Sequence, residues 1–148
     1  MLSFLFIKNN PEKLAETYYE SSDKETRQKI ITRLMELNAD LYIEQIFIKS
    51  PKEDLFEYLF KKYDNSAQKM FDYFLISIPD IKQKIVYQLI SLKADTFIKK
   101  LINTEYENMA VEYLIARYAN EVSQLIALLK TVTAENKKNI IKYIVKLN

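Results

Sequence analysis

The chain of 148 residues is long enough to bury the core of one domain, and its 49% hydrophobic and 28% charged residues exclude a disordered chain. It contains no Cys and no His, which excludes disulfides, thiolate or imidazole catalysis and ordinary zinc sites. A formal net charge of +2, from 22 basic and 20 acidic residues, is too balanced to indicate nucleic-acid binding by itself.

The missing glycines indicate the fold class. The chain has no Gly and only three Pro, so it is poor in the residues that tight hairpin turns between strands need. Its abundant Ile, Leu, Lys, Glu and Tyr suit helices joined by short polar corners. The sequence therefore predicts an all-α fold.

A repeat organises the chain. Residues 83–98 repeat residues 28–43, which sets a period of 55, and the same step relates Ile85 to Ile140. Residues 57–59 return in the same way as residues 112–114. A fixed period is typical of arrays of stacked supersecondary units, each of which buries its apolar face on the next.

The repeat predicts one domain of five two-helix units. Residues 1–9 are expected to form a partial leading helix, because Phe4 lies one period before Leu59. The units are expected at about 10–38, 39–64, 65–93, 94–119 and 120–148.

The first unit is expected to hold helices at about 11–21 and 24–37. In the second of these, Ile30, Ile31, Leu34 and Leu37 form one apolar stripe. The second unit is expected to hold helices at about 39–48 and 51–63, with Pro51 in the first turn of the latter.

The third unit is expected to hold a helix at about 65–77, capped by Asn65 or Ser66, and a second helix that starts near Pro79. The remaining helices are expected at about 94–103, 106–118, 120–131 and 134–147. Within each unit the two are called here the first and the second helix.

The motif Ala39-Asp40 with Ile43, which returns as Ala94-Asp95 with Ile98, resembles the short-unit kind of HEAT-like, armadillo-type repeat. The hairpins and this resemblance together predict a right-handed α-α solenoid of about five antiparallel helix hairpins plus a leading half-repeat. The resemblance further implies a superhelix whose second helices line the concave surface.

The outward face of the second helices carries the candidate binding residues. A step of 100° per residue places tyrosines and their equivalents in one row with cations beside it. The candidate residues are Tyr58, Tyr87, Tyr113, Lys29, Lys62, Lys84, Arg117, Lys138, Lys142 and Lys146. Such a Tyr/Lys groove suits protein interfaces, acidic peptides or stacked bases, but the tyrosines could equally pack between neighbouring helices.

No catalytic, cofactor or metal site is expected. Asp40 and Asp95 recur with the period, and we expect them to accept backbone N–H bonds where the first helices begin. A phosphate-binding loop would need glycines. The sequence favours a non-enzyme, and an enzyme that uses only carboxylates and tyrosines is the less favoured reading.

The two ends are apolar, and the last helix is basic. Residues 1–7 lack the features of a secretory signal, and no stretch is long and apolar enough to span a membrane. Residues 130–148 hold five Lys and one Glu, which suits a solvated helix or contact with RNA or anionic lipid. A partner or a second copy could cover either end, so that self-association through the ends is one expectation.

The favoured function is a non-enzymatic protein–protein interaction or scaffold module in the cytoplasm. It would bind another protein or peptide through the concave second-helix face or the uncapped ends. The alternative is a nucleic-acid-contacting helical repeat protein that uses the Lys/Tyr groove. Steep salt dependence of binding would distinguish the alternative.

Overall fold

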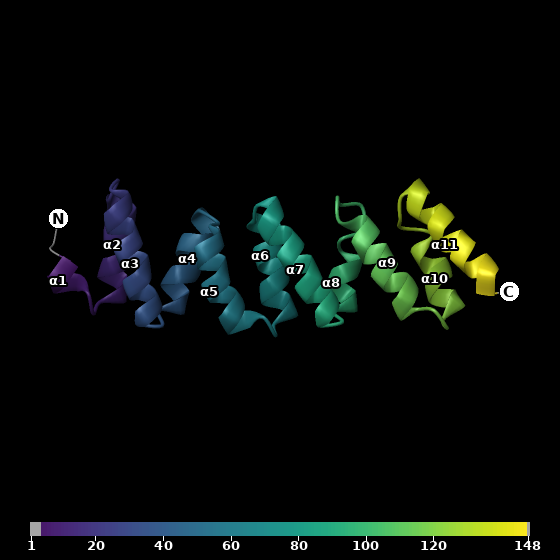
Figure 1. The fold of residues 1–148 in the computed structure, drawn as a ribbon, viewed down its shortest axis with the longest axis horizontal. Helices are drawn as coiled ribbons and strands as arrows, with labels where there is room; N and C mark the ends of the chain where they lie inside the picture. Colours follow the sequence, from purple (N-terminus) through teal and green to yellow (C-terminus); the bar gives the residue numbers. More distant parts are fainter. Residues whose placement is uncertain (1–3, 148) are drawn as a thin grey trace. The chain divides into compact units, whose positions relative to one another are not determined.

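The computed structural model describes residues 4–147, and this part of the chain is all-helical, with no strand. The predicted all-α fold is confirmed. The helices are α1 (Phe4–Ile7), α2 (Pro11–Glu20), α3 (Lys24–Glu36), α4 (Asp40–Lys49), α5 (Glu53–Tyr63), α6 (Ala67–Ile76), α7 (Pro79–Ser91), α8 (Asp95–Lys99), α9 (Glu107–Arg117), α10 (Val122–Leu128) and α11 (Ala134–Leu147) (Figure 1).

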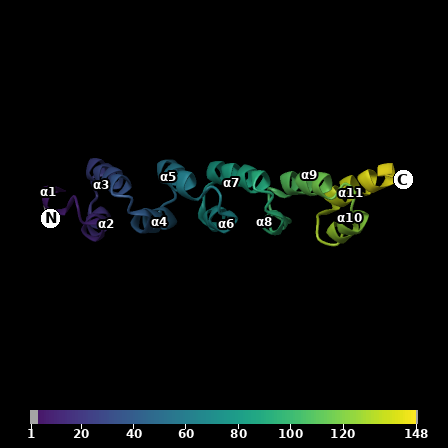
Figure 2. The same ribbon diagram turned by 90° about the horizontal axis from the view of Figure 1, so that it is seen from below.

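The helices group into two compact units. The first comprises the described residues of Met1–Asp64 together with Leu75–Ile81. In it α1 packs against α2, α2 against α3, α3 against α4 and α4 against α5. Helices α2 and α4 also touch, and Figure 2 shows them in one layer with α3 and α5 in the other. Successive hairpins therefore stack within this unit.

The second unit comprises Asn65–Phe74 and the described residues of Lys82–Asn148. Here α8 packs against α9, α10 against α11, and α9 against α11. Figure 2 shows α9 and α11 on one side of this unit and α8 and α10 on the other. Again neighbours in sequence are neighbours in space. The count of five repeats and the right-handed solenoid stay predictions.

The ends of α3 and α7 show the 55-residue period in the backbone. Asn38 and Lys93 adopt left-handed φ values of 52° and 54° one residue beyond each helical C-cap. The following amides of Ala39 and Ala94 donate to Leu34 and Leu89 at 3.0 and 3.1 Å. This is the Schellman motif, which glycine usually completes. Because the chain has no glycine, an asparagine and a lysine take the left-handed position instead.

Several helix boundaries differ from those expected. Helix α8 ends at Lys99 rather than near 103, because the following amides bond three residues back, as Leu101 N–H does to Ile98 O at 3.0 Å. Helix α5 begins at Glu53, so Pro51 precedes the N-cap residue Lys52 and does not lie in the first turn.

The expected capping and core residues of several helices are present. Ser66 Oγ accepts from Lys69 N–H at 3.2 Å before α6, as expected. In α3 the stripe residues Ile30, Ile31 and Leu34 are buried, whereas Leu37 is half-buried at the C-cap. Burying such side chains stabilises the fold by about 1.5–3 kcal/mol each.

Candidate interaction surface

The first Tyr–Asp pair, Tyr58 and Asp40, joins α5 to the start of α4. The Tyr58 hydroxyl donates to Asp40 Oδ1 at 2.5 Å, and the Tyr63 hydroxyl donates to Oδ2 at 3.4 Å. Lys62 Nζ lies 3.7 Å from Oδ1 and donates to Asn38 Oδ1 at 2.9 Å. Burial and the bond to Asp40 raise the pKa of Tyr58 above its ordinary value of 10.0.

The second Tyr–Asp pair, Tyr113 and Asp95, repeats this arrangement one period later between α9 and α8. The Tyr113 hydroxyl donates to Asp95 Oδ1 at 2.7 Å, and Arg117 Nε lies 3.2 Å from Oδ2. Burial, followed by the bond to Asp95, raises the pKa of Tyr113 to about 12. An arginine thus takes the place that Lys62 has in the first pair.

The role expected of the two recurring aspartates needs a correction. Asp40 and Asp95 are the first residues of α4 and α8, where a negative charge complements the helix dipole as expected. Their carboxylates, however, accept from tyrosine hydroxyls of the following helix rather than capping backbone N–H groups. Each aspartate therefore ties the two helices of its own hairpin together.

The three tyrosines of the predicted row differ in their surroundings. The hydroxyls of Tyr58 and Tyr113 are engaged within the chain. Tyr87 on α7 is 57% exposed, and its equivalents one period away are Thr32 and Lys142. Of the three, Tyr87 is therefore the ring most available for contact with a partner.

The predicted cations also differ in their surroundings. Lys29 lies 3.3 Å from Glu25 on the surface of α3, and Lys62 and Arg117 belong to the Tyr–Asp pairs. Lys84 is exposed on α7. The three predicted cations of α11 are exposed and form no ion pair within residues 4–147; they are Lys138, Lys142 and Lys146.

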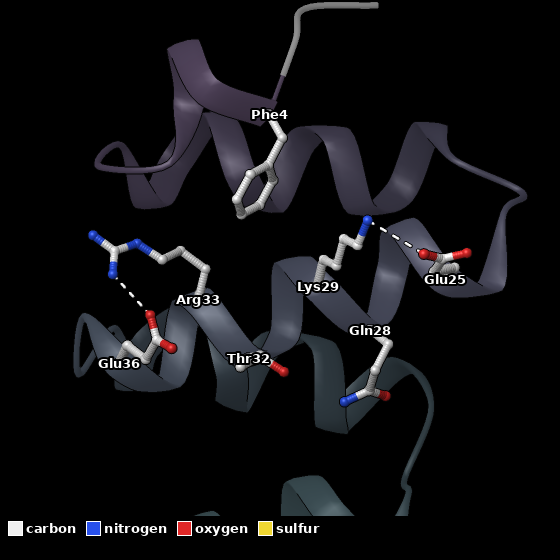
Figure 3. Close-up of a pocket in the computed structure, with 7 residues that line it drawn as sticks. All are labelled: Phe4, Glu25, Gln28, Lys29, Thr32, Arg33 and Glu36. Carbon is white, nitrogen blue, oxygen red and sulfur yellow. Dashed lines mark hydrogen bonds and ion pairs between the residues drawn. The ribbon is translucent and has the colours of Figure 1, made fainter.

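A groove of about 320 Å³ lies on the outward face of α3 in the first unit. Figure 3 shows the Phe4 ring of α1 lying over this face, where it forms one wall of the groove. Arg33 lies 2.8 Å from Glu36, so the groove contains two ion pairs, this one and Lys29–Glu25. The lining residues are Phe4, Glu25, Gln28, Lys29, Thr32, Arg33 and Glu36.

Arg33 also fixes the wall of this groove. Its Nε donates to Lys8 O at 2.7 Å, and its Nη2 donates to Asn9 Oδ1 at 2.7 Å. These two bonds tie the connection between α1 and α2 to α3. Because Lys29 and Arg33 each face a glutamate, the lining is electrically neutral.

Glu107 was not singled out in the sequence, yet it is the buried carboxylate of the second unit. It accepts from Asn103 N at 3.0 Å, from the backbone N–H and hydroxyl of Thr133, and from Asn136 Nδ2 at 2.6 Å. Burial by itself would raise the pKa of Glu107, but the bonds from Thr133, Asn136 and Asn103 outweigh it and lower the pKa. Position 52, one period earlier, is a lysine, so the repeat gave no signal.

A second hollow, of about 380 Å³, lies beside α8 and α10 in the second unit. Two lysines border it, and both lie over aromatic rings: Lys99 Nζ is 5.1 Å from the Tyr118 ring centre, and Lys100 Nζ is 5.1 Å from that of Phe97. The sequence gave no indication of this hollow.

The described part of the chain contains neither a metal-binding group of acidic side chains nor a membrane-spanning helix. Residues 4–147 contain no group of three Asp or Glu side chains placed to hold a metal ion. Among the helices of these residues, none has the length and apolar character that crossing a lipid bilayer requires.

Comparisons of the chain with protein-family models, with curated proteins and with solved structures find no match.

Proposed function

We propose that this chain is a non-enzymatic interaction module that binds another protein through the exposed face of its second helices. The groove on α3 is the observation that carries this proposal. It combines an aromatic wall, Phe4, with an arginine held in place by Lys8 and Asn9. Aromatic side chains and arginine are enriched at the energetic centres of protein interfaces.

The charge of the groove favours a peptide segment as its occupant. Lys29 and Arg33 face Glu25 and Glu36 at 3.3 and 2.8 Å, so neither sign of charge predominates. A polyanion would gain little from such a lining, whereas a polypeptide can offer an apolar side chain to Phe4 and polar groups to the rim. In the second unit, Tyr87 on α7 is a further exposed aromatic ring. The predicted HEAT-like solenoid belongs to this proposal.

Site-specific cross-linking tests the proposal. A photoreactive residue at Thr32, on the floor of the groove, should capture a defined protein from extracts of the source cell. The same residue at Lys61, which is exposed on α5, serves as the control. The substitution Phe4→Ala should weaken the capture at Thr32 about tenfold or more, because it removes an aromatic wall. Equal capture at both positions would argue against the groove.

A second candidate function, nucleic-acid contact, is favoured by one observation. Lys138, Lys142 and Lys146 are exposed along α11 without an ion pair within the described residues. Such a row could neutralise about three phosphates, and binding to single-stranded RNA should then fall with salt with a logarithmic slope of about −2. Binding that is undetectable at low salt would remove this candidate.

A further inference from the structure

The last helix exposes an apolar face that its equivalents bury. Helices α3, α7 and α11 correspond to one another at the 55-residue period. Ile31 of α3 and Val86 of α7 are buried, whereas the matching Ile141 of α11 is 50% exposed. Val145, one turn further along, is 66% exposed. Helix α3 packs against both α2 and α4, whereas α11 packs against α9 and α10, so the face of α11 that carries Ile141 stays open.

A row of lysines borders this face. Lys138, Lys142 and Lys146 follow one another at intervals of four residues, which places them about 6 Å apart along the helix. All three are exposed. A chain that covers Ile141 and Val145 and carries acidic groups at the same spacing would therefore match this positive charge.

Helices α1 and α2 carry exposed apolar side chains and a row of acids that complement the surface of α11. On α1, Leu5 and Phe6 are 71% and 84% exposed, and α1 packs against α2. Helix α2 has an exposed row of acids at the same four-residue interval: Glu12, Glu16 and Glu20. Lys13 lies 3.3 Å from Glu16, but this pair is exposed and holds Glu16 only weakly.

We infer that a second copy of this chain covers the apolar face of α11. The α10–α11 end of one copy would bind the α1–α2 end of the next, with Ile141 and Val145 against Leu5 and Phe6. The lysine row of α11 would face the glutamate row of α2. This goes beyond the proposed function, which uses the groove on α3.

The charge distribution decides between two ways of pairing. A symmetric contact of α11 with α11 would bring together two ends that each hold five Lys and one Glu over residues 130–148. The head-to-tail contact brings opposite charges together instead. A head-to-tail contact is not symmetric, so further copies can add to it, and it produces rings or open chains of more than two copies rather than a symmetric dimer.

Sedimentation velocity of the whole chain between about 10 µM and 1 mM tests this inference. We expect the mean mass to rise with concentration through dimer to larger species, and to fall when salt is added. Val145→Lys should weaken association about tenfold, because it places a charge in the apolar contact. Since Val145 is 66% exposed, helicity should be retained, and circular dichroism checks this.

A charge exchange provides the sharper test. The triple variants K138E/K142E/K146E and E12K/E16K/E20K should each be monomeric alone, because each has like charges at both ends. Mixed in equal amounts, they should associate again. Lys61→Glu on α5 is the control and should associate as the unchanged chain does. A chain that stays monomeric at about 1 mM, or variants that associate alone as strongly as the unchanged chain, would overturn the inference. So would a dimer that does not grow.

Discussion

Glu107 concentrates much of the polar stabilisation of the second unit in one side chain. Its buried carboxylate accepts from Asn103, which precedes α9, and from Thr133 and Asn136, which follow α10. Thr133 immediately precedes α11, so the negative charge also lies at the positive end of that helix dipole. One residue thus links the start of α9 to the start of α11.

Glu107→Gln should lower the free energy of unfolding by about 2–3 kcal/mol at pH 7. Both carboxylate oxygens of Glu107 accept hydrogen bonds, whereas a glutamine has one oxygen that accepts and an NH₂ group that cannot. Urea unfolding followed by circular dichroism measures the difference. The unchanged hydrodynamic radius of the folded variant would show that the fold is retained.

The same residue predicts a pH dependence. The pKa of Glu107 is lower in the folded chain than its ordinary value of 4.5. Its stabilisation is therefore complete above about pH 4.5 and is lost as the pH falls through the folded-state pKa. The gap in unfolding free energy between the unchanged chain and Glu107→Gln should shrink below pH 4.5. A gap that stays constant down to pH 3 would contradict this account.

The left-handed corner residues predict a gain in stability. Lys93 is exposed at φ 54°, a conformation that costs a residue with a Cβ more than it costs glycine. Lys93→Gly should raise the free energy of unfolding by about 0.5–1 kcal/mol, and Lys93→Ala should not. Thermal melting of the two variants compares them directly. Destabilisation by Lys93→Gly would mean that this corner differs from a Schellman motif.

At the scale of the helix, the two Tyr–Asp pairs hold the first helix of a hairpin to its second. Tyr58→Phe and Tyr113→Phe should each lower the free energy of unfolding by about 0.5–1.5 kcal/mol, because each removes the tyrosine's hydrogen bond to the aspartate. Tyr87→Phe is the matched control and should change it by less than about 0.5 kcal/mol, since that ring is exposed. Equal losses for all three variants would show that the aspartates contribute nothing.

The raised pKa of Tyr113 predicts sensitivity to alkali. Its pKa rises to about 12 in the folded chain from an ordinary value of 10.0. Because the pKa is raised, the stabilisation that the bond from Tyr113 to Asp95 gives the fold is complete below about pH 10 and is lost as the pH rises towards 12. Spectrophotometric titration of the Tyr58→Phe variant should show one tyrosine that ionises after most of the others. Its disappearance in the Tyr58→Phe/Tyr113→Phe double variant would assign it.

The helices could be predicted from the sequence because their signals are local. Apolar stripes such as Ile30, Ile31 and Leu34, and caps such as Ser66, depend on residues within two turns. The end of α8 could not be predicted, because it depends on three-residue bonds around Leu101. Asp40 and Tyr58 each recur with the period, but nothing in the sequence shows that they touch across 18 residues.

At the scale of the molecule, the chain consists of two compact units in which helices pack against their neighbours in sequence. The sequence predicted the packing of neighbouring helices, because the period of 55 repeats whole hairpins, but it gave no sign of the division into two compact units. The two Tyr–Asp pairs show the period in side-chain contacts. The groove on α3 was only partly predicted: Lys29 was among the candidate residues, but the wall formed by Phe4 depends on the fold of α1.

The measurement that tests the proposed function most directly is hydrogen exchange of the chain with and without the protein captured at Thr32. Binding in the groove should slow amide exchange in α1, in the connection at Lys8 and Asn9, and along α3. Exchange in α4, α8 and α10 should stay unchanged. Slower exchange that is confined to α4, α8 and α10, or no protection at α3, would contradict binding through the exposed face of the second helices.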